Sequence, residues 1–499
     1  MAAARSILFS VFGPRISQNS LRYFSADNPN CLKATNSSSP KEIVNWMCNH
    51  AAIFRVANDA ISVMTEPAYF FETLKDNIKS ANRRIVLASL YLGTGPLEKE
   101  LVELIYNSIQ ASKKANEPSG LQVEILLEYT RGSRGKVNSR TMLLPLLQEF
   151  SDSVRVSLYH SPELRGLIKR LLPERFNETV ALTHLKVYLT DDTVIMSGAN
   201  LSNDYFTNRQ DRYIEIKNSP EVADFFHELV SSVSDISLQL HKDDTTHMLK
   251  DFAFHPSESN KTEFITKATE RLKTLVHSCS GKKAIRFLGD KPGTWVVPLL
   301  QMYPYSIRQD EYVTSELLGS LPEDSKLLLA SGYFNLTKKY IDLLLHSAAS
   351  CHILTAHPTA NGFYMAKGIA GGIPDAYTQI AREFFRRTLT HHHRITIWEY
   401  ARQHWTFHVK GLWYYPPNHA LPCLTLIGSP NFGYRSVYRD LEAQVAIVTE
   451  DKDLQARLHE EQKCFYARGC RVTYRTFEHA ERRVPVWVYV VTKFIKKFL

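Results

Sequence analysis

Cysteine is scarce in this 499-residue chain, and its seven copies are scattered. They are Cys31, Cys48, Cys279, Cys351, Cys423, Cys464 and Cys470, an odd number with no C-x-x-C pair. This pattern argues against a disulfide scaffold and a cysteine zinc site, and it favours reduced thiols. Long apolar runs are also missing, since no stretch reaches the roughly 18 uninterrupted apolar residues that a membrane-spanning helix needs. Any membrane contact should therefore be peripheral.

The overall composition is that of a globular protein. Apolar residues make up 44% and charged residues 22% of the chain, which excludes a mostly disordered or collagen-like protein. The length predicts two or three domains, or one large domain made by duplication. The formal net charge is +9, so phosphate, nucleic acid or acidic lipid is a plausible partner class, and the charge alone does not choose among them.

Acidic residues are absent from the first 26 residues. This segment contains Arg5, Arg15, Arg22 and five serines, and residues 22–24 (RYF) before Ser25 resemble a matrix-processing site. An Arg-rich, Ser-rich and acid-poor composition predicts a mitochondrial presequence over residues 1–25, whereas Arg15 and Arg22 interrupt the apolar core of any secretory signal. The alternative is an ordinary disordered terminus. Residues 26–40 are predicted to form a polar linker.

Two parts of the chain repeat the same order of segments. Residues 86–92 (VLASLYL) align with residues 328–334 (LLASGYF), and both runs have the apolar character of buried strands. A helical pattern follows each run, and then two further apolar strands. These are residues 95–109, 123–127 and 154–159 in one part and residues 336–348, 352–355 and 394–398 in the other. The alternation predicts largely parallel sheets covered by helices, and the repetition predicts an internal duplication.

We therefore expect an α/β protein with two repeats, over residues 41–250 and 260–480. The final segment, residues 484–499, is apolar with Trp487 and Tyr489 and ends in lysines. It is too short to span a bilayer comfortably, so we expect an interfacial anchor on anionic lipid. The alternative is a last core strand with a capping helix.

A histidine, a lysine and an asparagine recur at matching intervals. They are His184, Lys186 and Asn200 in the first repeat, and His408, Lys410 and Asn431 in the second. The second interval is seven residues longer, and an enlarged hairpin loop at residues 416–422 (PPNHALP) accounts for the difference. A single H-x-K is common by chance, but two copies with matching downstream asparagines indicate a functional site.

These residue types suit chemistry at phosphorus. Residues two positions apart on a strand point to the same face, so each histidine lies beside its lysine. Imidazole, ammonium and amide groups together suit an anionic phosphoryl centre. If the repeats meet about a pseudo-twofold axis, one imidazole can attack phosphorus while the other transfers a proton. We expect no metal and no cofactor, because the lysines and amides supply the charge stabilisation.

The paired H-x-K-x4-D and G-S-x-N pattern resembles the phospholipase D superfamily. The runs THLKVYLTDDTVIMSGANLSNDYFTNRQDRY and HVKGLWYY with LIGSPNFGYRSVYRDLEAQVAIVTE are similar to the mitochondrial phosphatidylglycerophosphate synthases, and the likeness covers roughly residues 40–490. The resemblance implies duplicated phospholipase D-like α/β/α sandwich domains with the active site at the pseudo-twofold interface.

The two motifs differ from each other. Asp191 occupies the acidic position of the first motif, whereas the second has Tyr415 there. Residues 197–200 read SGAN where the pattern expects G-S-x-N, which residues 428–431 follow. The resemblance implies that an acid after each asparagine orients a histidine. Asp211 and Glu442 each follow their asparagine by 11 positions, and Glu215 is the alternative in the first repeat.

The predicted site includes further residues. The catalytic set is His184, Lys186, Asp191, Asn200, Asp211, His408, Lys410, Asn431 and Glu442. The substrate-contact candidates are Ser429 and Arg435 in the second motif block, Lys367 in the glycine-rich residues 361–375, and Gly93 and Gly95 in a strand-to-helix turn. The turn could equally be an ordinary one, and the glycine-rich segment simply mobile. The run of His391, His392 and His393 makes a poor metal site, because adjacent side chains on a strand point to opposite faces.

The resemblance implies CDP-diacylglycerol and glycerol 3-phosphate as substrates. His184 attacks the phosphorus that carries diacylglycerol, CMP leaves with a proton from His408, and His408 then deprotonates the acceptor hydroxyl. The expected location is an anionic membrane surface on the matrix side of the inner mitochondrial membrane, to which the basic run Arg165, Lys169, Arg170 and Arg175 could also bind. Nucleic acid is not expected, because no basic block interleaved with aromatics is present. Lipid hydrolysis, cardiolipin synthesis, nuclease activity and an inert membrane scaffold remain alternatives.

Overall fold

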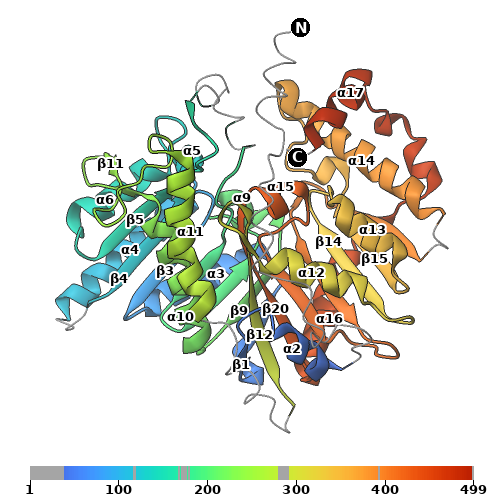
Figure 1. Ribbon diagram of the computed structural model, residues 1–499, viewed down its shortest axis with the longest axis horizontal. Coiled ribbons are helices and arrows are strands. Elements are labelled where there is room, and N and C mark those ends of the chain that lie inside the picture. Colours follow the sequence, from blue (N-terminus) through green and yellow to red (C-terminus); the bar gives the residue numbers. More distant parts are fainter. Residues whose placement is uncertain are drawn as a thin grey trace.

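The computed structural model describes residues 39–115, 120–166, 169, 177, 180–278, 292–390 and 394–496. Two α/β halves stand side by side, the first in blue to green and the second in yellow to red (Figure 1). The predicted presequence, almost all of the predicted linker, residues 391–393, Arg170 and Arg175 lie outside the described residues. Within the part that the structure describes, no helix combines the length and apolar character needed to cross a membrane.

The first half is built on a nine-stranded sheet. Its strands, in spatial order, are β11 (Thr246–His247), β10 (Leu238–Leu240), β5 (Val154–Tyr159), β4 (Gln122–Glu128), β3 (Arg84–Ala88), β6 (Val187–Thr190), β7 (Thr193–Ser197), β9 (Tyr213–Ile216) and β2 (Ile61–Met64). The three strands β3, β4 and β5 are parallel, and the other pairings are antiparallel.

The second half repeats this order in a ten-stranded sheet. Its strands are β1 (Phe54–Val56), β12 (Thr294–Met302), β20 (Leu441–Thr449), β19 (Leu424–Gly428), β18 (Lys410–Tyr415), β14 (Lys326–Ser331), β15 (Ser350–Ala356), β16 (Ile395–Tyr400) and β21 (Gly469–Arg471), with β13 (Ile307–Arg308) beside β12. From β5 to β2 the first sheet matches β16 to β12 of the second, strand for strand. The predicted duplicated α/β fold is confirmed.

The sheets are mixed, and the prediction of largely parallel sheets was wrong. Each half has three parallel strands, followed by an antiparallel run through β6, β7 and β9 or β18, β19 and β20. The antiparallel run arises because the H-x-K strand turns back through a hairpin without a crossover helix. The predicted loop at residues 416–422 joins β18 to β19, and Asn418 in it has a φ of 60°.

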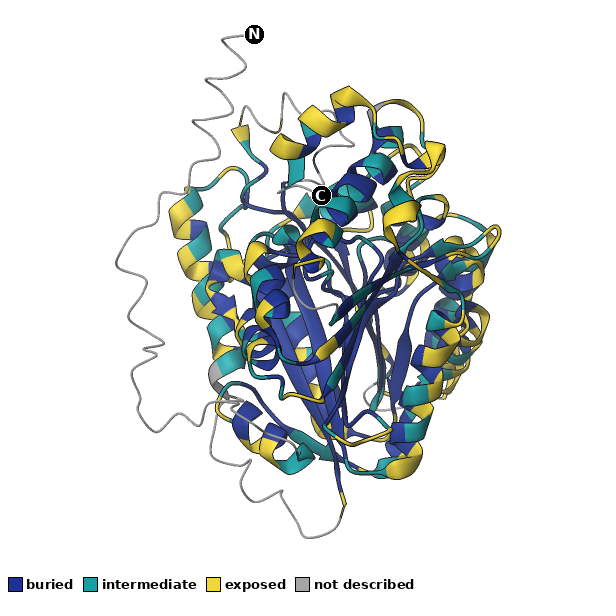
Figure 2. Ribbon diagram, turned by 90° about the vertical axis from the view of Figure 1, so that its right-hand side faces the viewer, coloured by how far each residue is buried: buried dark blue, intermediate teal, exposed yellow. Residues whose placement is uncertain are grey.

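Helices cover both faces of each sheet. The first half contains α3 (Pro67–Ser80), α4 (Pro96–Lys114), α5 (Tyr129–Gly132), α6 (Ser139–Glu149), α9 (Asn203–Thr207), α10 (Pro220–Asp235) and α11 (Lys261–Ser278). The second half contains α12 (Gln309–Gly319), α13 (Lys338–His346), α14 (Ile373–Thr388), α15 (Tyr434–Tyr438), α16 (Lys452–Tyr466) and α17 (Val486–Ile495). Short 3-10 turns lie at Asn58–Ala60, Tyr303–Tyr305, Pro358–Ala360, Gly368–Gly372, Tyr474–Phe477 and Ala480–Arg482. The strands are buried, and the surface helices alternate buried and exposed bands (Figure 2).

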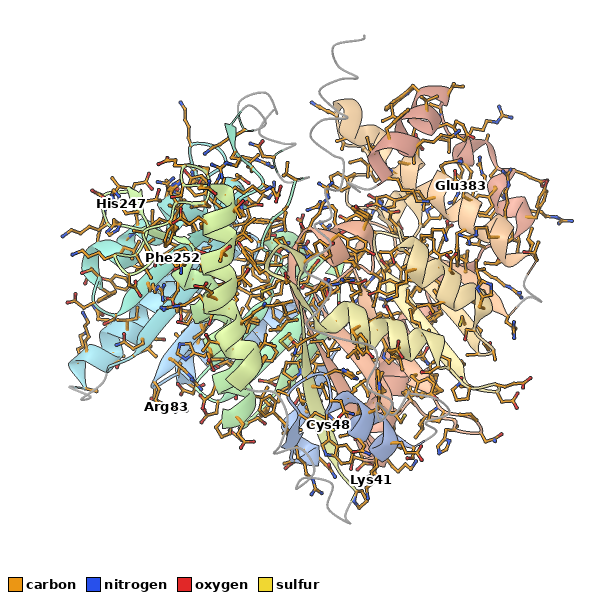
Figure 3. All side chains as sticks on the ribbon, in the orientation of Figure 1. Lys41, Cys48, Arg83, His247, Phe252 and Glu383 are labelled. Atoms are coloured by element: carbon orange, nitrogen blue, oxygen red, sulfur yellow. The ribbon has the colours of Figure 1, made fainter. Side chains whose placement is uncertain are left out.

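The first segment of the folded chain belongs to the second half, which corrects the predicted start of the first repeat at residue 41. The helix α2 (Pro40–Met47) packs into the outer core of the second half, and β1 pairs antiparallel with β12. Figure 3 shows Lys41 of α2 and Cys48, the residue that follows this helix, at the lower edge of the second half. Burial of Ile43, Val44 and Met47 explains why this helix docks there.

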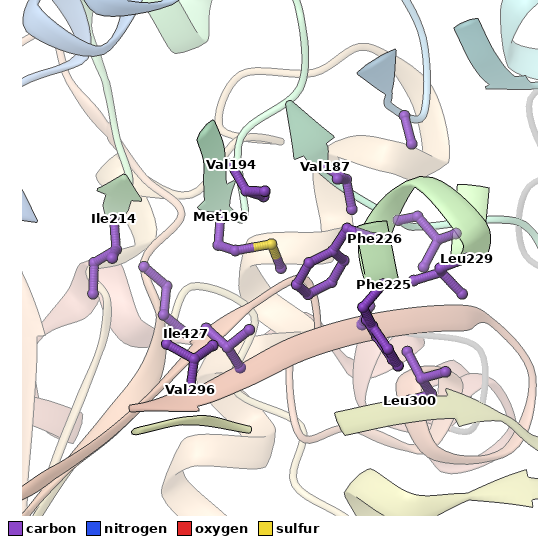
Figure 4. Packing of buried hydrophobic residues seen from close by; sticks show 14 of the residues in the cluster. Val187, Val194, Met196, Ile214, Phe225, Phe226, Leu229, Val296, Leu300 and Ile427 are labelled. Carbon is purple, nitrogen blue, oxygen red and sulfur yellow. The ribbon is translucent and has the colours of Figure 1, made fainter. Parts of the chain in front are cut away.

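The two halves share a central core. Strand residues alternate between faces, so Val187 and Leu189 point inward, whereas Tyr188 packs with the outer helices of the first half. Side chains from β6, β7 and β9 lie with Phe225, Phe226 and Leu229 of α10 and with residues of the second sheet (Figure 4). Helices α10 and α16 thus lie between the sheets, and the halves form one continuous apolar interior.

A buried ion pair joins the halves inside this core. The Arg212 guanidinium, at the start of β9, is fully buried and binds Glu461 of α16 through two nitrogens, at 2.8 and 2.7 Å. It also donates to the main-chain oxygen of Leu426 and the hydroxyl of Thr425, both at 2.8 Å, and stacks 3.9 Å above the Trp413 ring. Every side of the guanidinium therefore has a partner from the second half.

We expect Glu461→Gln to lower the free energy of unfolding by about 3–5 kcal/mol, because it leaves the Arg212 charge buried and uncompensated. Urea denaturation followed by circular dichroism measures this change. Glu460→Gln is the matched control, since the neighbouring Glu460 is exposed and pairs with the exposed Lys463 of the same helix. Its effect should stay within about 0.5 kcal/mol. Equal effects of the two substitutions would contradict the role of the buried pair.

Candidate active site

Each H-x-K segment crosses from its own half to the other. Thr183 forms a parallel bridge to Leu441, and the His184 amide donates to the Leu441 oxygen at 2.8 Å. The second segment does the same through β17 (Thr406–Phe407), which pairs in parallel with β8 (Arg209–Gln210). The His408 amide donates to the Gln210 oxygen at 2.8 Å. The main chain therefore fixes each histidine against the half to which it does not belong.

Each histidine also contacts a carboxylate of the opposite half. Nδ1 of His184 lies 2.9 Å from Oε2 of Glu442, and Nδ1 of His408 lies 2.7 Å from Oδ2 of Asp211. A carboxylate can only accept, so Nδ1 carries the proton and Nε2 is left as the basic atom in both rings. The alternative acid Glu215 instead accepts from Asn77 at 2.9 Å, outside this site.

The two lysines are buried beside their histidines. Nζ of Lys186 donates to the His184 oxygen at 2.9 Å, and Nζ of Lys410 donates to the His408 oxygen at 2.8 Å. Nζ of Lys410 also lies 2.7 Å from Nδ1 and 3.1 Å from Nε2 of His408, and 3.9 Å from Asp211. Gly198 makes room here, because a Cβ on it would lie 3.0 Å from the Lys410 nitrogen and from both Asp211 oxygens. The positive charge is therefore held within reach of Nε2.

Burial and the neighbouring cations determine the charge state of the site. Burial, then Lys186, lowers the pKa of His184 well below its ordinary value, and burial, then Lys410, does the same to the pKa of His408. Burial lowers the pKa of Lys410 to about 8 and raises the pKa of Asp211 to about 6. Near pH 7 the site thus contains neutral imidazoles, an ammonium and a carboxylate. Lys186 and Lys410 each affect the histidine of the opposite half, so the two motifs form one site.

The asparagines lie on loops at the ends of β7 and β19. Nδ2 of Asn200 donates to the Tyr205 hydroxyl at 3.0 Å, and the main-chain oxygen of Asn431 accepts from Ser331 at 3.1 Å. Among the described residues, the buried Oδ1 atoms of Asn200 and Asn431 have no hydrogen-bond partner. A half-turn of a carboxamide exchanges its oxygen and its nitrogen, so the NH₂ group can occupy the position of the unpartnered oxygen. Each amide can then donate a hydrogen bond to a bound phosphoryl oxygen.

The surroundings of the two histidines differ. The His408 ring is 4% exposed and meets the edges of Tyr205 and Tyr333, with ring centroids 5.1 and 5.6 Å away. Arg209 donates to the Tyr333 hydroxyl at 2.8 Å. The His184 ring is 14% exposed, and its neighbours include an Arg435–Asp440 ion pair of 3.1 Å, both members of which affect its pKa. His184 is therefore the more accessible imidazole.

Asp191 does not reach this site, which corrects its predicted catalytic role. It turns the chain between β6 and β7 with a φ of 47°, at the end of β6 away from His184. Its carboxylate accepts the main-chain amides of residues 82–84 at 2.8–3.1 Å. Asp191, at the acidic position of the motif, therefore holds the β6–β7 hairpin against the start of β3. Tyr415, at the matching end of β18, binds His459 at 3.0 Å, so its difference from aspartate leaves the histidine site intact.

The remaining candidates have different positions. Ser429 is buried and bonds to Ala443 in both directions at 3.1 Å, which supports the strand next to Glu442 without leaving its hydroxyl open to a substrate. Arg435 lies near His184 through its pair with Asp440. Lys367 is exposed on the glycine-rich segment, directly before the 3-10 turn Gly368–Gly372.

The turn with Gly93 and Gly95 does not offer an anion site. Gly93 donates its amide to Leu201 at 2.8 Å, and the buried Glu98 side chain lies against both glycines. Glu98 also accepts the Asn203 amide at 2.6 Å. A carboxylate of the chain itself therefore occupies the N-terminus of α4, where a phosphate was expected.

Four residues that the sequence analysis did not single out border the site: Tyr205, Arg209, Tyr333 and Asp440. The repeat alignment contains a signal for them, because Arg209 and Asp440 each precede the orienting acid by two positions. Tyr333 lies within the aligned run at residues 328–334, where it matches Tyr91 of residues 86–92. Within the described ranges, no cluster of three or more histidine, cysteine or acidic side chains is placed to hold a metal ion.

The repeated sheet order, with one histidine crossing from each half, defines a duplicated phospholipase D-like α/β fold. The fold is similar to that of the phosphatidylserine synthase of Haemophilus influenzae Rd KW20, with a TM-score of 0.70, 20% identity, and coverage of 92% of this chain and 100% of that one. No protein-family model matches the chain.

Curated relatives give a narrower family. The chain is 50% identical over 475 residues to the mitochondrial CDP-diacylglycerol–glycerol-3-phosphate 3-phosphatidyltransferase of Mus musculus, covering 91% of this chain and 86% of the relative. It is 38% identical over 482 residues to a probable enzyme of that name from Dictyostelium discoideum, covering 91% and 82%. The chain belongs to the CDP-diacylglycerol–glycerol-3-phosphate 3-phosphatidyltransferase family.

We expect the imidazoles of His184 and His408 to be neutral at pH 6.5, with the proton on Nδ1, whereas an ordinary histidine is half-protonated there. Nitrogen-15 NMR of histidine-labelled protein resolves the tautomers, and His408→Asn assigns the second set of signals. Lys410→Met should raise the pKa of His408 because it removes the nearest cation, and the exposed Lys463→Met should leave it unchanged. An imidazolium signal from both residues at pH 6.5 would refute this charge state.

Proposed function

We propose that this chain transfers the phosphatidyl group of CDP-diacylglycerol to sn-glycerol 3-phosphate, giving phosphatidylglycerophosphate and CMP. The observation that carries the proposal is the 50% identity to mitochondrial enzymes of this name over 91% of the chain. The crossed histidine site supports it, because its groups suit transfer at phosphorus through a covalent intermediate.

In the first step, Nε2 of His184 attacks the phosphorus that bears diacylglycerol. A nitrogen–phosphorus bond forms, and the bond from that phosphorus to the bridging oxygen breaks, so the electron pair leaves with CMP. Glu442 holds the Nδ1 proton of His184 and balances the positive charge that develops on the ring. The leaving oxygen belongs to a phosphate whose second pKa is about 6, so it needs little help from an acid.

In the second step, Nε2 of His408 takes the proton of the primary hydroxyl of glycerol 3-phosphate. The hydroxyl oxygen attacks phosphorus, the nitrogen–phosphorus bond breaks, and His184 returns to its neutral form. Burial and Lys410 keep His408 neutral, which suits it to this basic role and modifies the expectation that it first acts as an acid. Asp211 stabilises the imidazolium that forms, and the proton then passes to solvent.

The other buried groups stabilise the transferred phosphoryl group. Lys410 holds positive charge within the site, and the amides of Asn200 and Asn431 have unused capacity there. Burial lowers the pKa of Lys186 well below its ordinary value, so a bound phosphoryl anion favours the charged form of this second amino group. These donors are positioned before substrate binds, so little reorganisation is needed as charge develops on the phosphoryl oxygens. We assign the nucleophile to His184 because its ring is the more exposed of the two.

We expect His184→Ala to form no phosphoprotein from CDP-diacylglycerol labelled in the phosphatidyl phosphate. His408→Ala should still release CMP and accumulate an acid-labile labelled protein, while transfer to glycerol 3-phosphate falls by about 100-fold or more, because only the acceptor requires a base. Gel autoradiography and CMP release measure both steps.

The exposed His404→Ala is the matched control for the loss of a histidine, and it should leave both steps unchanged. Labelling that survives in His184→Ala and disappears in His408→Ala would assign the nucleophile to His408. A wild-type chain that releases CMP without forming labelled lipid would show that water is the acceptor.

We also propose that the chain acts on the matrix side of the inner mitochondrial membrane, bound peripherally to anionic lipid. The composition of residues 1–25 supports mitochondrial import, and relatives are named mitochondrial. Helix α17 supports the membrane contact, because it buries Val488 and Thr492 and turns its other side outward. The exposed side chains are Val486 (80%), Trp487 (49%), Tyr489 (41%), Val490 (48%) and Phe494 (75%).

This apolar face is linked to the active site by the glycine-rich segment. Gly362 lies against Arg209 and Tyr333 of the site, whereas Gly372 lies against Trp487 of α17. Between them, Phe363, Tyr364 and Met365 are 37, 50 and 84% exposed. Aromatic and apolar side chains beside lysines suit the headgroup region of an anionic bilayer, and a substrate with acyl chains must enter from such a surface.

We expect Met365→Ser combined with Phe494→Ser to weaken binding to vesicles of phosphatidylcholine and cardiolipin by about tenfold or more. The reason is that the double variant lacks two apolar side chains whose transfer from water into the bilayer favours binding. Vesicle sedimentation measures the affinity. Val137→Ser, at an apolar position that is 64% exposed in the first half, should have no effect. Unchanged binding by the double variant would place the membrane contact elsewhere.

A further inference from the structure

Arg209 is the most unusual charged group beside the histidines. Its guanidinium lies 4.7 Å from the centre of the Tyr205 ring, and Nη2 donates to the Tyr333 hydroxyl at 2.8 Å. Both rings meet the His408 imidazole edge-on, and the Arg209 charge contributes to the lowered pKa of His408. The guanidinium is therefore part of the wall around His408.

In the part of the chain that the structure describes, no carboxylate pairs with this charge. Among the described residues, Arg209 makes no ion pair within 4 Å, and its buried Nε has no hydrogen-bond partner. Other enclosed arginines differ, since Arg212 pairs with Glu461 and Arg482 pairs with Glu399. A largely enclosed cation without an anion is unfavourable unless a ligand supplies the negative charge.

The pseudo-twofold arrangement makes the contrast sharper. The position of Arg209, two residues before the orienting acid, is occupied in the second half by Asp440. Asp440 pairs with Arg435 beside His184, so the charges on that side are already balanced. The unbalanced positive charge is thus confined to the side of His408.

The reaction brings two phosphates to that side. In an in-line displacement the leaving and attacking oxygens occupy the position opposite the nucleophile, which for His184 is the side of His408. The leaving group there is CMP, a phosphate monoester, and the acceptor that replaces it carries a phosphate three carbons from its reacting hydroxyl. A planar guanidinium binds such a group through two parallel hydrogen bonds.

We infer that Arg209 forms a phosphate-monoester subsite that is used twice, first by the phosphate of departing CMP and then by the phosphate of the incoming acceptor. This inference rests on the proposed function and identifies how an acceptor with a phosphate is selected over water or glycerol. Tyr333 holds the guanidinium in place, and Gly362 closes over it, because a Cβ there would lie 2.6 Å from Nη2.

The test compares two acceptors, glycerol 3-phosphate and glycerol, with the full chain and CDP-diacylglycerol in mixed detergent and lipid. Arg209→Gln should reduce kcat/KM for glycerol 3-phosphate by about 10- to 100-fold, the range for losing hydrogen bonds to a charged group, and should change that for glycerol by less than about threefold. Arg209→Lys should restore part of the preference. CMP should inhibit the wild type more strongly than Arg209→Gln, whereas cytidine should not distinguish them.

Two further variants separate recognition from structure. Tyr333→Phe removes only the hydroxyl that holds the guanidinium and should raise KM for glycerol 3-phosphate several-fold with little change for glycerol. Arg402→Gln removes an arginine that stacks 3.3 Å above Trp405, and it should leave both acceptors unaffected. Thermal unfolding of each variant reports on its fold.

Equal losses for both acceptors in Arg209→Gln and in Tyr333→Phe would overturn the inference, as would unchanged inhibition by CMP. A shift of the pH profile with the acceptor preference intact would instead identify Arg209 as a positioning residue for His408. If the wild-type chain itself fails to label lipid from glycerol 3-phosphate, the proposed function fails, a result distinct from a loss of acceptor preference in the variants.

Discussion

The two imidazole–carboxylate contacts that run between the halves are the constraint on which the site depends. Each half contributes one histidine and the acid that orients the histidine of the other half. Separated halves would expose two lysines, two acids and two rings that the complete structure buries. The surrounding apolar core and the buried Arg212–Glu461 pair keep these partners together. The contacts that orient the two histidines are thus also contacts that hold the two halves together.

Much of this arrangement could be predicted from the sequence. Apolar runs and their repetition predicted the strands β3 and β14 with the helix and the two strands that follow each, and the matching intervals identified His184, His408 and their lysines. The crossing of acids to opposite histidines was not predictable, because it depends on how the halves pack. Asp191 was misassigned since a motif position does not reveal which end of a strand carries the chemistry. The docking of α2 and β1 on the second half is likewise a tertiary contact that local patterning does not encode.

Duplication supplied symmetry, and substitution at equivalent positions then removed it. Arg209 and Asp440 occupy matching places with opposite charge, and Tyr205 matches Ser436. As a result, one imidazole lies beside a balanced ion pair and the other beside an unbalanced cation and two aromatic rings. A symmetric pair of histidines would have no reason to act differently. The local charge difference supports the different roles that we propose for the two rings.

The long sequence separation of these contacts also affects how the molecule forms. The main chains of Leu182 and His184 form hydrogen bonds with Leu441, and α2 packs beside β20. Early segments of the folded chain can therefore complete their contacts only after a segment near the C-terminal end has been synthesised. Contacts between such distant residues close large loops and form late in folding. During synthesis the reactive centre is therefore among the last features to appear. An incomplete chain that stops before β20 has an unoriented His184 and an unfinished second sheet, and it cannot carry out half of the chemistry by itself.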